Sequence, residues 1–141
     1  MRCEDYTCVF GSDVFGIRKV AEEAMLFIYG AIPKIRGDAA IETRLILNEA
    51  LINAVKHGNE LDENKKASLQ IKIETANTVV IQITDEGQGF DHRRLRKDLE
   101  TMETVLREDG RGMKLIYALS DKTTHNRRGN EITIYKKVIF D

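Results

Sequence analysis

Two stretches of alternating apolar and polar residues constrain the fold of this chain most. Residues 69–73 carry leucine or isoleucine at every second position, and residues 79–83 repeat the pattern with valine and isoleucine. This period of two is that of a β-strand with one buried face and one polar face. Ala76 and Asn77 lie between the stretches and supply a turn, so the pattern predicts a hairpin of two antiparallel strands.

The remaining patterns predict helices over residues 14–31, 39–57 and 111–120, and strands over 3–10, 123–126 and 132–140. Ser12 or Asp13 would cap the first helix, which Pro33 and the glycines of residues 30–37 would end. Asp38 is the expected N-cap of the second helix. Elements in this order predict an α/β fold, a two-layer sandwich of helices on a mixed, largely antiparallel sheet.

Composition favours one domain over residues 1–141, because no repeat or linker interrupts a chain that is 42% hydrophobic. A net charge of −1 gives no basic field for nucleic acid or anionic membranes. The longest apolar stretch, residues 24–33, is shorter than the roughly 20 residues that span a bilayer, and no signal peptide is recognisable. Cys3 and Cys8 are too few for a disulfide framework or zinc site. A cytoplasmic protein is expected.

The second predicted helix combines a polar stripe with an otherwise apolar sequence. Within residues 45–55 only Asn48, Glu49 and Asn53 are not apolar, so we expect this helix to be buried nearly all round. Glu49 and Asn53 are four positions apart and share one face. Because a buried carboxylate without a partner is costly, this stripe must face water, a partner or a ligand. His57 follows one turn later, where capping of helix carbonyls is an equally good interpretation.

A first glycine segment follows the hairpin. Asp85 closes the second strand, and Gly87 and Gly89 permit a turn in which a ligand approaches the backbone closely. A carboxylate at such a strand end can accept a hydrogen bond from an amino group, such as the exocyclic amine of adenine. Taken alone, the segment also fits an ordinary Asp-Glu-Gly turn.

A second glycine segment, Gly110-Arg111-Gly112, opens the third predicted helix. Unpaired backbone N–H groups and the helix dipole make the start of a helix a ready anion site. Arg111 would add positive charge there, although an arginine in a loop is usually solvated. This segment therefore predicts an anion site.

In this order and with these gaps, the three segments resemble the N box and the two glycine boxes of the GHKL ATPase superfamily. The resemblance covers nearly the whole chain and implies the histidine-kinase-like ATPase domain fold. Within this superfamily the likeness is strongest to the small bacterial anti-sigma-factor serine/threonine kinases. These are single ATP-binding domains of about this size, with an N box much like Glu-Ala-x-x-Asn-Ala-x-x-His.

The resemblance implies ATP and Mg²⁺ as ligands and assigns a role to each matching residue. Glu49 would be the general base, Asn53 would hold Mg²⁺ on the triphosphate, and Asp85 would bind the adenine amine. Gly87 and Gly89 would shape the base pocket, Gly110 and Gly112 would lie by the phosphates, and His57 and Arg111 would also face the nucleotide. The stretch between the glycine boxes would form a lid.

One departure from the family pattern lies near the C-terminus. Family members usually end a glycine turn there with a threonine that helps to bind adenine, whereas here Gly129 is followed by Asn130 and Glu131. Asn130 would substitute for the threonine, and Glu131 would face away from the base.

The resemblance implies that the chain phosphorylates a serine or threonine of an anti-sigma-factor antagonist and sequesters a sigma factor; a homodimer is compatible with this role. Phosphorylation adds negative charge to the antagonist and would break its complex with the kinase. Two alternatives stay open. One is a histidine-kinase-type catalytic domain acting on a separate phosphoacceptor, since no histidine precedes His57. The other is a non-catalytic switch in which bound ATP orders the lid around a partner.

Overall fold

The computed structural model describes residues 5–75, 77–87 and 108–138 of the chain. The elements in chain order are β1 (Asp5–Gly11), α1 (Val14–Ala31), α2 (Gly37–Ile52), the π-helix η1 (Asn53–Gly58), β2 (Lys66–Glu74), β3 (Thr78–Asp85), α5 (Glu108–Leu119), β4 (Lys122–His125) and β5 (Glu131–Lys137).

The strands form one sheet in the order β1-β2-β3-β5-β4, and every described pairing is antiparallel. The sheet is therefore antiparallel throughout its described part, not mixed as the sequence predicted. The predicted hairpin is present, with Leu69 opposite Ile83 and Ile71 opposite Ile81. All four of these side chains are buried, because the period of two directs them to the same face.

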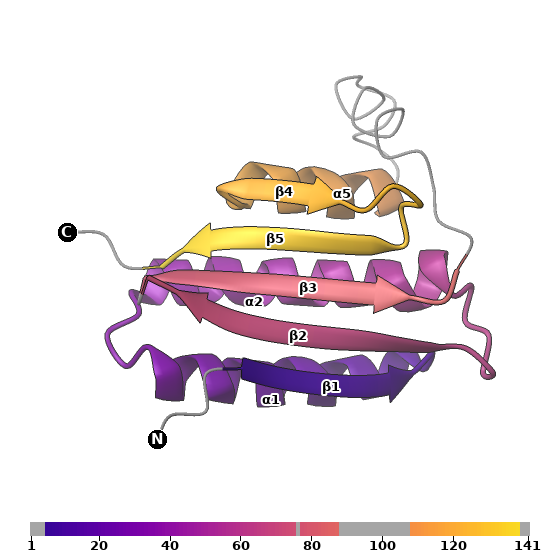
Figure 1. The fold of residues 1–141 in the computed structure, drawn as a ribbon, viewed down its shortest axis with the longest axis horizontal. Helices are drawn as coiled ribbons and strands as arrows, with labels where there is room; N and C mark the ends of the chain where they lie inside the picture. Colours follow the sequence, from indigo (N-terminus) through magenta and orange to yellow (C-terminus); the bar gives the residue numbers. More distant parts are fainter. Residues whose placement is uncertain (1–4, 76, 88–107, 139–141) are drawn as a thin grey trace.

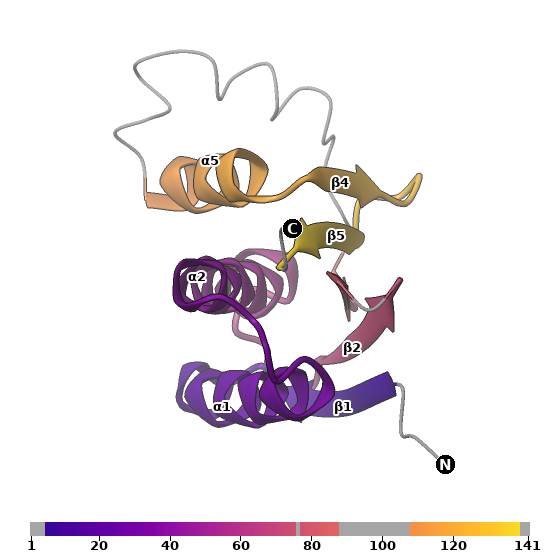
Figure 2. The same cartoon turned by 90° about the vertical axis from the view of Figure 1, so that its left-hand side faces the viewer.

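The fold is an α/β sandwich of two layers, as predicted. Helices α1, α2 and α5 lie side by side against one face of the sheet (Figures 1 and 2). The core lies between the layers, where aliphatic side chains from all three helices meet those of the strands. Its largest fully buried members are Met25, Ile28, Ile46, Leu47, Leu51, Val55, Leu69, Ile71, Ile81, Ile83, Ile116 and Ile134.

The second helix is less buried than its apolar sequence predicted. Figure 2 shows α2 between α1 and α5, with the sheet on one side. Its opposite side is open, so Ile41 is 64% exposed and Leu45 is 40% exposed. The prediction of burial nearly all round was wrong because no described element covers that side. The polar stripe, with Glu49 in α2 and Asn53 in η1, borders α5.

Of the two predicted helix N-caps, the structure has one at α1 and a different residue at α2. The Asp13 side chain caps α1 by accepting a bond from the N–H of Phe15, whereas Ser12 is buried and donates elsewhere. At α2 the prediction of Asp38 as N-cap was wrong. Arg36 is the N-cap, because its carbonyl already accepts the N–H of Ala40 at 2.8 Å, and Asp38 lies inside the first turn.

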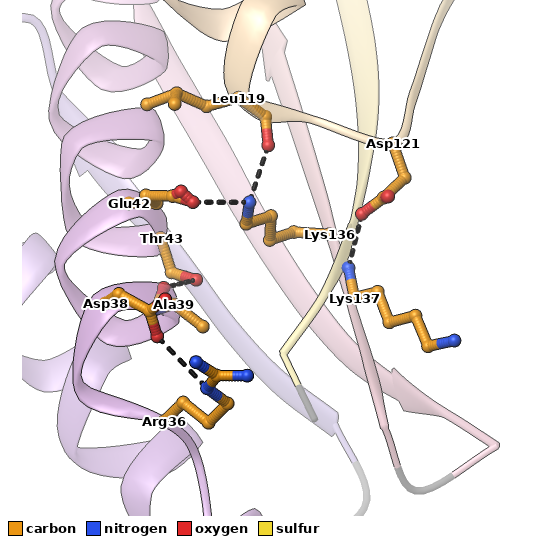
Figure 3. A network of polar contacts seen from close by, with 9 residues as sticks. All are labelled: Arg36, Asp38, Ala39, Glu42, Thr43, Leu119, Asp121, Lys136 and Lys137. Atoms are coloured by element: carbon orange, nitrogen blue, oxygen red, sulfur yellow. Dashed lines mark hydrogen bonds and ion pairs between the residues drawn. The ribbon is translucent and has the colours of Figure 1, made fainter. Parts of the chain in front are cut away.

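A buried lysine ties α5, α2 and β5 together. Lys136 is only 6% exposed, and its ammonium group donates to the Glu42 carboxylate at 3.1 Å and to the Leu119 carbonyl at 2.7 Å (Figure 3). The Leu119 carbonyl is at the C-terminal end of α5, where the helix dipole favours a cation. This contact fixes the end of α5 that is far from the glycine segment.

None of the helices in the described ranges combines the length and the apolar character that a bilayer crossing requires.

Candidate functional site

The second helix changes its hydrogen-bonding pattern within the polar stripe, between Glu49 and Asn53. The α-helix ends at Ile52, and residues Asn53–Gly58 form a π-helix instead of continuing the α-helix that the sequence predicted to residue 57. Single π-helical turns inside helices occur frequently at functional sites, because they re-aim side chains. Asn53 is the first residue of this turn, and His57 near its end is exposed.

One cluster joins the polar stripe to the second glycine segment. A Cβ atom built on Gly112 would lie 2.6 Å from Glu49 Oε2 and 3.7 Å from Asn53 Oδ1. Glycine at this position therefore lets the start of α5 approach the carboxylate and the carboxamide of the preceding helix. Glu49, Asn53 and Gly112, which the sequence grouped by motif alone, are brought together.

The carboxamide of Asn53 has one donor group that no described residue uses. Its Nδ2 atom is buried and has no hydrogen-bond partner among the residues that the structure describes. Buried polar groups are normally paired, so this orphan indicates a site for a ligand. The oxygens of Asn53 and Glu49 are the ligand type that Mg²⁺ prefers, and Mg²⁺ usually completes its shell with water and substrate phosphates. The residues present fit that ion.

A second cluster surrounds Asp85 at the end of β3. The N–H of Gly87 donates to Asp85 Oδ1 at 2.8 Å. A Cβ atom at Gly58 would overlap the Asp85 carboxylate, and one at Gly87 would lie 2.6 Å from the carbonyl carbon of Gly58. Both glycines are therefore required for the end of η1 to pack against the turn after β3. Gly58, to which the sequence assigned no role, belongs to this cluster.

The environment of Asp85 perturbs its acidity. Burial raises the pKa of the carboxyl above its usual value, while the N–H of Gly87 and the positive charges of Arg128 and Lys65 act in the opposite direction. A half-buried carboxylate that accepts one backbone hydrogen bond still has acceptor positions available. The group is suited to bind a neutral amino donor, as a base amine would be.

The hairpin between β4 and β5 supports the same turn from its other side. The Asp85 N–H donates to the carbonyl of Asn130, and the side-chain Nδ2 of Asn130 donates to the Asp85 carbonyl, each at 2.9 Å. Arg128 donates to the Gly87 carbonyl at 3.0 Å. The strand ends that carry these residues meet at the right-hand end of the sheet in Figure 1.

The side chains of Asn130 and Glu131, the two residues after Gly129, are both bonded to other residues of the chain. The carboxamide of Asn130 already bonds to Asp85 and accepts a bond from Asn126 Nδ2 at 2.8 Å, so it supports Asp85. The Glu131 carboxylate accepts a bond from the Thr84 hydroxyl at 2.8 Å, across the β3–β5 pair. Asn130 is placed beside the turn, and Glu131 is bound to the sheet.

For three further residues of the predicted site, Gly89, Gly110 and Arg111, the structure describes the backbone at most. Gly110 and Arg111 lie in the first turns of α5, where the structure describes the backbone. Gly89 lies outside the described residues, as does most of the predicted lid between the glycine boxes.

The sequence analysis did not single out Asn59, a buried polar residue beside the Asp85 turn. Asn59 is 0% exposed, and its Oδ1 accepts the N–H of Glu86 at 2.8 Å. It follows directly after Gly58 in a stretch rich in polar residues, so nothing in its local sequence distinguishes it from a solvated loop residue. Arg128 was missed for the same reason.

Comparison with known proteins identifies related sequences. The family described as "Histidine kinase-like ATPase domain" matches residues 14–136. An anti-sigma F factor of Anoxybacillus flavithermus is 29% identical over 102 residues, which cover 72% of this chain and 63% of that protein. An anti-sigma F factor of Geobacillus stearothermophilus is 29% identical over 105 residues, which cover 73% and 71%.

A serine-protein kinase RsbW of Staphylococcus aureus is 29% identical over 102 residues, which cover 68% of this chain and 58% of that protein. The match thus spans less than two thirds of the length of the Anoxybacillus and Staphylococcus relatives.

Proposed function

Because the chain belongs to the histidine kinase-like ATPase domain family, we propose that it is an ATP-dependent protein serine/threonine kinase that acts as an anti-sigma factor. In this proposal it phosphorylates an anti-sigma-factor antagonist, sequesters a sigma factor and works in the cytoplasm. The relatives named anti-sigma F factor and serine-protein kinase support both halves of the proposal.

The convergence of Glu49, Asn53 and Gly112 carries the proposal. Phosphoryl transfer depends mainly on positioning and on neutralising the charge of the triphosphate. The buried Nδ2 of Asn53 has no partner among the described residues and can donate to a phosphate oxygen. Gly112, in the second turn of α5, leaves room beside Glu49 Oε2 and Asn53 Oδ1. Bound Mg²⁺, held by Asn53, would supply charge neutralisation for the phosphates.

In the reaction, Glu49 acts on the acceptor hydroxyl. Its carboxylate takes the hydroxyl proton as the oxygen forms a bond to the γ-phosphorus and the bond from that phosphorus to the bridging oxygen of ADP breaks. The backbone N–H groups at the start of α5 donate to phosphate oxygens. Asp85 holds the adenine amine, which fixes the nucleotide at the other end of the site.

The central test replaces Glu49 with glutamine, which preserves size but cannot take the proton. With labelled ATP and a candidate antagonist, we expect Glu49→Gln to lower the transfer rate by roughly 10²–10⁴-fold while nucleotide affinity changes little. Glu22→Gln, a change on the exposed side of α1, is the matched control and should transfer at the wild-type rate. Transfer by Glu49→Gln at the wild-type rate would remove Glu49 from catalysis.

The same assay separates the alternatives. Phosphate on a serine survives acid, whereas phosphate on a histidine does not, so acid-labile product would favour a histidine-kinase-type domain. If the wild-type protein transfers nothing but binds partners only with nucleotide, the switch is the better account. Asn53→Ala, titrated with ATP in the presence and absence of Mg²⁺, should lose the dependence of nucleotide affinity on the metal.

A further inference from the structure

The buried side chain of Asn59 connects the end of η1 with the turn after β3. It follows the last residue of η1, and its backbone N–H donates to the Ala54 carbonyl at 2.8 Å, which closes the π-helical turn. Its side chain leaves the helix and reaches the turn after β3, where Oδ1 accepts the N–H of Glu86. One residue thus connects the helix that carries Asn53 with the turn that carries Asp85.

The rest of the carboxamide is held rigidly. Its Nδ2 donates to Ser12 Oγ at 2.9 Å and to the Lys66 carbonyl at 3.0 Å. The Ser12 hydroxyl in turn donates to the Lys65 carbonyl at 2.8 Å. Both N–H groups of the side chain are therefore used, and they fix the orientation of Oδ1 from the loop after β1 and from the start of β2.

Because Asn59 Oδ1 binds the N–H of Glu86, its fixed orientation affects the turn after β3. Glu86 lies between Asp85, whose carboxylate faces Gly58, and Gly87, whose N–H donates to that carboxylate. Asn130 binds the backbone of Asp85 from the opposite side. The peptide between Asp85 and Glu86 is held from both sides, so the direction of the carboxylate is determined before any ligand binds.

We propose that Asn59 is a positioning residue for recognition of the nucleotide base, acting through the turn that carries Asp85. This inference rests on the proposed nucleotide site and deepens it. None of the hydrogen bonds that Asn59 makes among the described residues goes to Glu49, Asn53 or Gly112. Loss of its side chain should therefore affect the base and leave binding of the phosphates unchanged.

The test compares Asn59→Ala with a matched control, Ser12→Ala. Both changes remove a partner from the same buried network, but only Asn59→Ala leaves the Glu86 N–H unpaired. Affinities for ATP, GTP and inorganic tripolyphosphate, each with Mg²⁺, are measured by calorimetry without any acceptor protein. We expect Asn59→Ala to weaken ATP binding roughly tenfold and to lower the ratio of ATP to GTP affinity, with tripolyphosphate affinity unchanged.

Two further measurements keep the inference decidable if Asn59→Ala unfolds. Asn59→Asp retains an acceptor for the Glu86 N–H while losing the amide donors, so it should lose stability but keep the selectivity for ATP over GTP. Hydrogen exchange at the Glu86 amide should be slow in the wild type, Ser12→Ala and Asn59→Asp, and fast in Asn59→Ala.

The outcomes separate this inference from the kinase proposal. Wild-type protein that binds ATP selectively but transfers no phosphate overturns the kinase proposal and leaves the role of Asn59 standing. Equal losses of ATP and tripolyphosphate affinity in Asn59→Ala, or equal losses of selectivity in Asn59→Ala and Ser12→Ala, overturn the positioning role. Loss of selectivity in Asn59→Asp overturns it as well.

Discussion

At Gly112 the addition of a single methyl group is expected to lower the rate of phosphoryl transfer strongly. In Gly112→Ala the new methyl group would lie 2.6 Å from Glu49 Oε2, so the carboxylate must move. Because the end of a glutamate side chain moves easily, the fold should adapt with little loss of stability. A misplaced catalytic group can cost about 10²-fold, and we expect a fall of that size in the transfer rate.

Gly30→Ala is the matched control, since a Cβ atom at Gly30 in α1 meets nothing within 4 Å. Replacing a helical glycine by alanine should raise the free energy of unfolding by about 0.4–1 kcal/mol and leave transfer unchanged. Full activity in Gly112→Ala would show that Glu49 does not need its described position.

At Asp85 we expect a substitution that raises the stability of the protein to weaken the proposed binding of the base. Burial raises the pKa of this carboxyl above its usual value of 3.8, so the folded protein binds the proton more tightly than the unfolded chain does. The resulting stabilisation is complete below the unfolded pKa and is lost as pH rises through the folded pKa. Asp85→Asn, which does not titrate, should therefore gain stability relative to the wild type as pH rises from acid to neutral.

Denaturant unfolding of both proteins across that pH range measures the difference. The same variant places an amide donor where the adenine amine is expected, so ATP affinity should fall by roughly tenfold or more. If the difference in the free energy of unfolding between the two proteins does not change with pH, burial does not raise the pKa of Asp85. Unchanged ATP affinity would move the base site elsewhere.

The sequence predicted those site residues that are polar in an apolar setting. Glu49 and Asn53 interrupt a hydrophobic helix, and Asp85 ends a hydrophobic strand, so each is anomalous in its own segment. Asn59 is not anomalous, because its neighbours are also polar. Its role depends on Glu86 and Ser12, which are 27 and 47 positions away, and no local pattern encodes such contacts.

At the scale of elements, the prediction succeeded where periodicity is strong. Helix α1 has the predicted bounds, and each predicted strand that lies in the described ranges is present within a few residues. The π-helix could not be predicted, because residues 53–58 fit an α-helix equally well in composition and the difference lies in hydrogen-bond pairing. The start of α2 was misplaced because an aspartate in the first turn resembles a cap.

We expect the attachment of α5 to α2 and β5 through Lys136 to stabilise the fold measurably. Lys136→Met preserves most of the apolar stem but removes the donor to Glu42 and to the Leu119 carbonyl. Hydrogen bonds of charged groups contribute about 1.5–3 kcal/mol, and we expect the free energy of unfolding to fall by that amount.

Arg44→Met is the comparison, because Arg44 pairs with Glu22 at 3.7 Å on the surface between α2 and α1. An exposed pair of this kind contributes less than about 1 kcal/mol. Urea titrations of the two variants measure both values. Equal effects would show that the buried contact does not hold α5 more strongly than a surface pair would.

In the whole molecule, the site is a meeting point of segments that are far apart in the chain. Residues 49–59, 85–87, 112 and 126–130 meet because β3 ends and the β4–β5 hairpin turns at the same end of the sheet (Figure 1). The aspartate turn is bonded from both the helix side and the hairpin side. The proposed base site therefore depends on η1, the end of β3 and the β4–β5 hairpin, whereas the Glu49–Gly112 contact involves only α2 and α5.

The one-sided covering of the sheet has a consequence for how this sequence can vary over generations. Along β2, Leu69 and Ile71 face the helices, while Gln70 belongs to a row of uncharged polar side chains that crosses the opposite face through Gln82 to Thr133. The number of tolerated substitutions should therefore alternate with every second residue along β2 and β3. After Asp85 the alternation should stop, because glycines and bonded peptide groups of the backbone constrain the turn there.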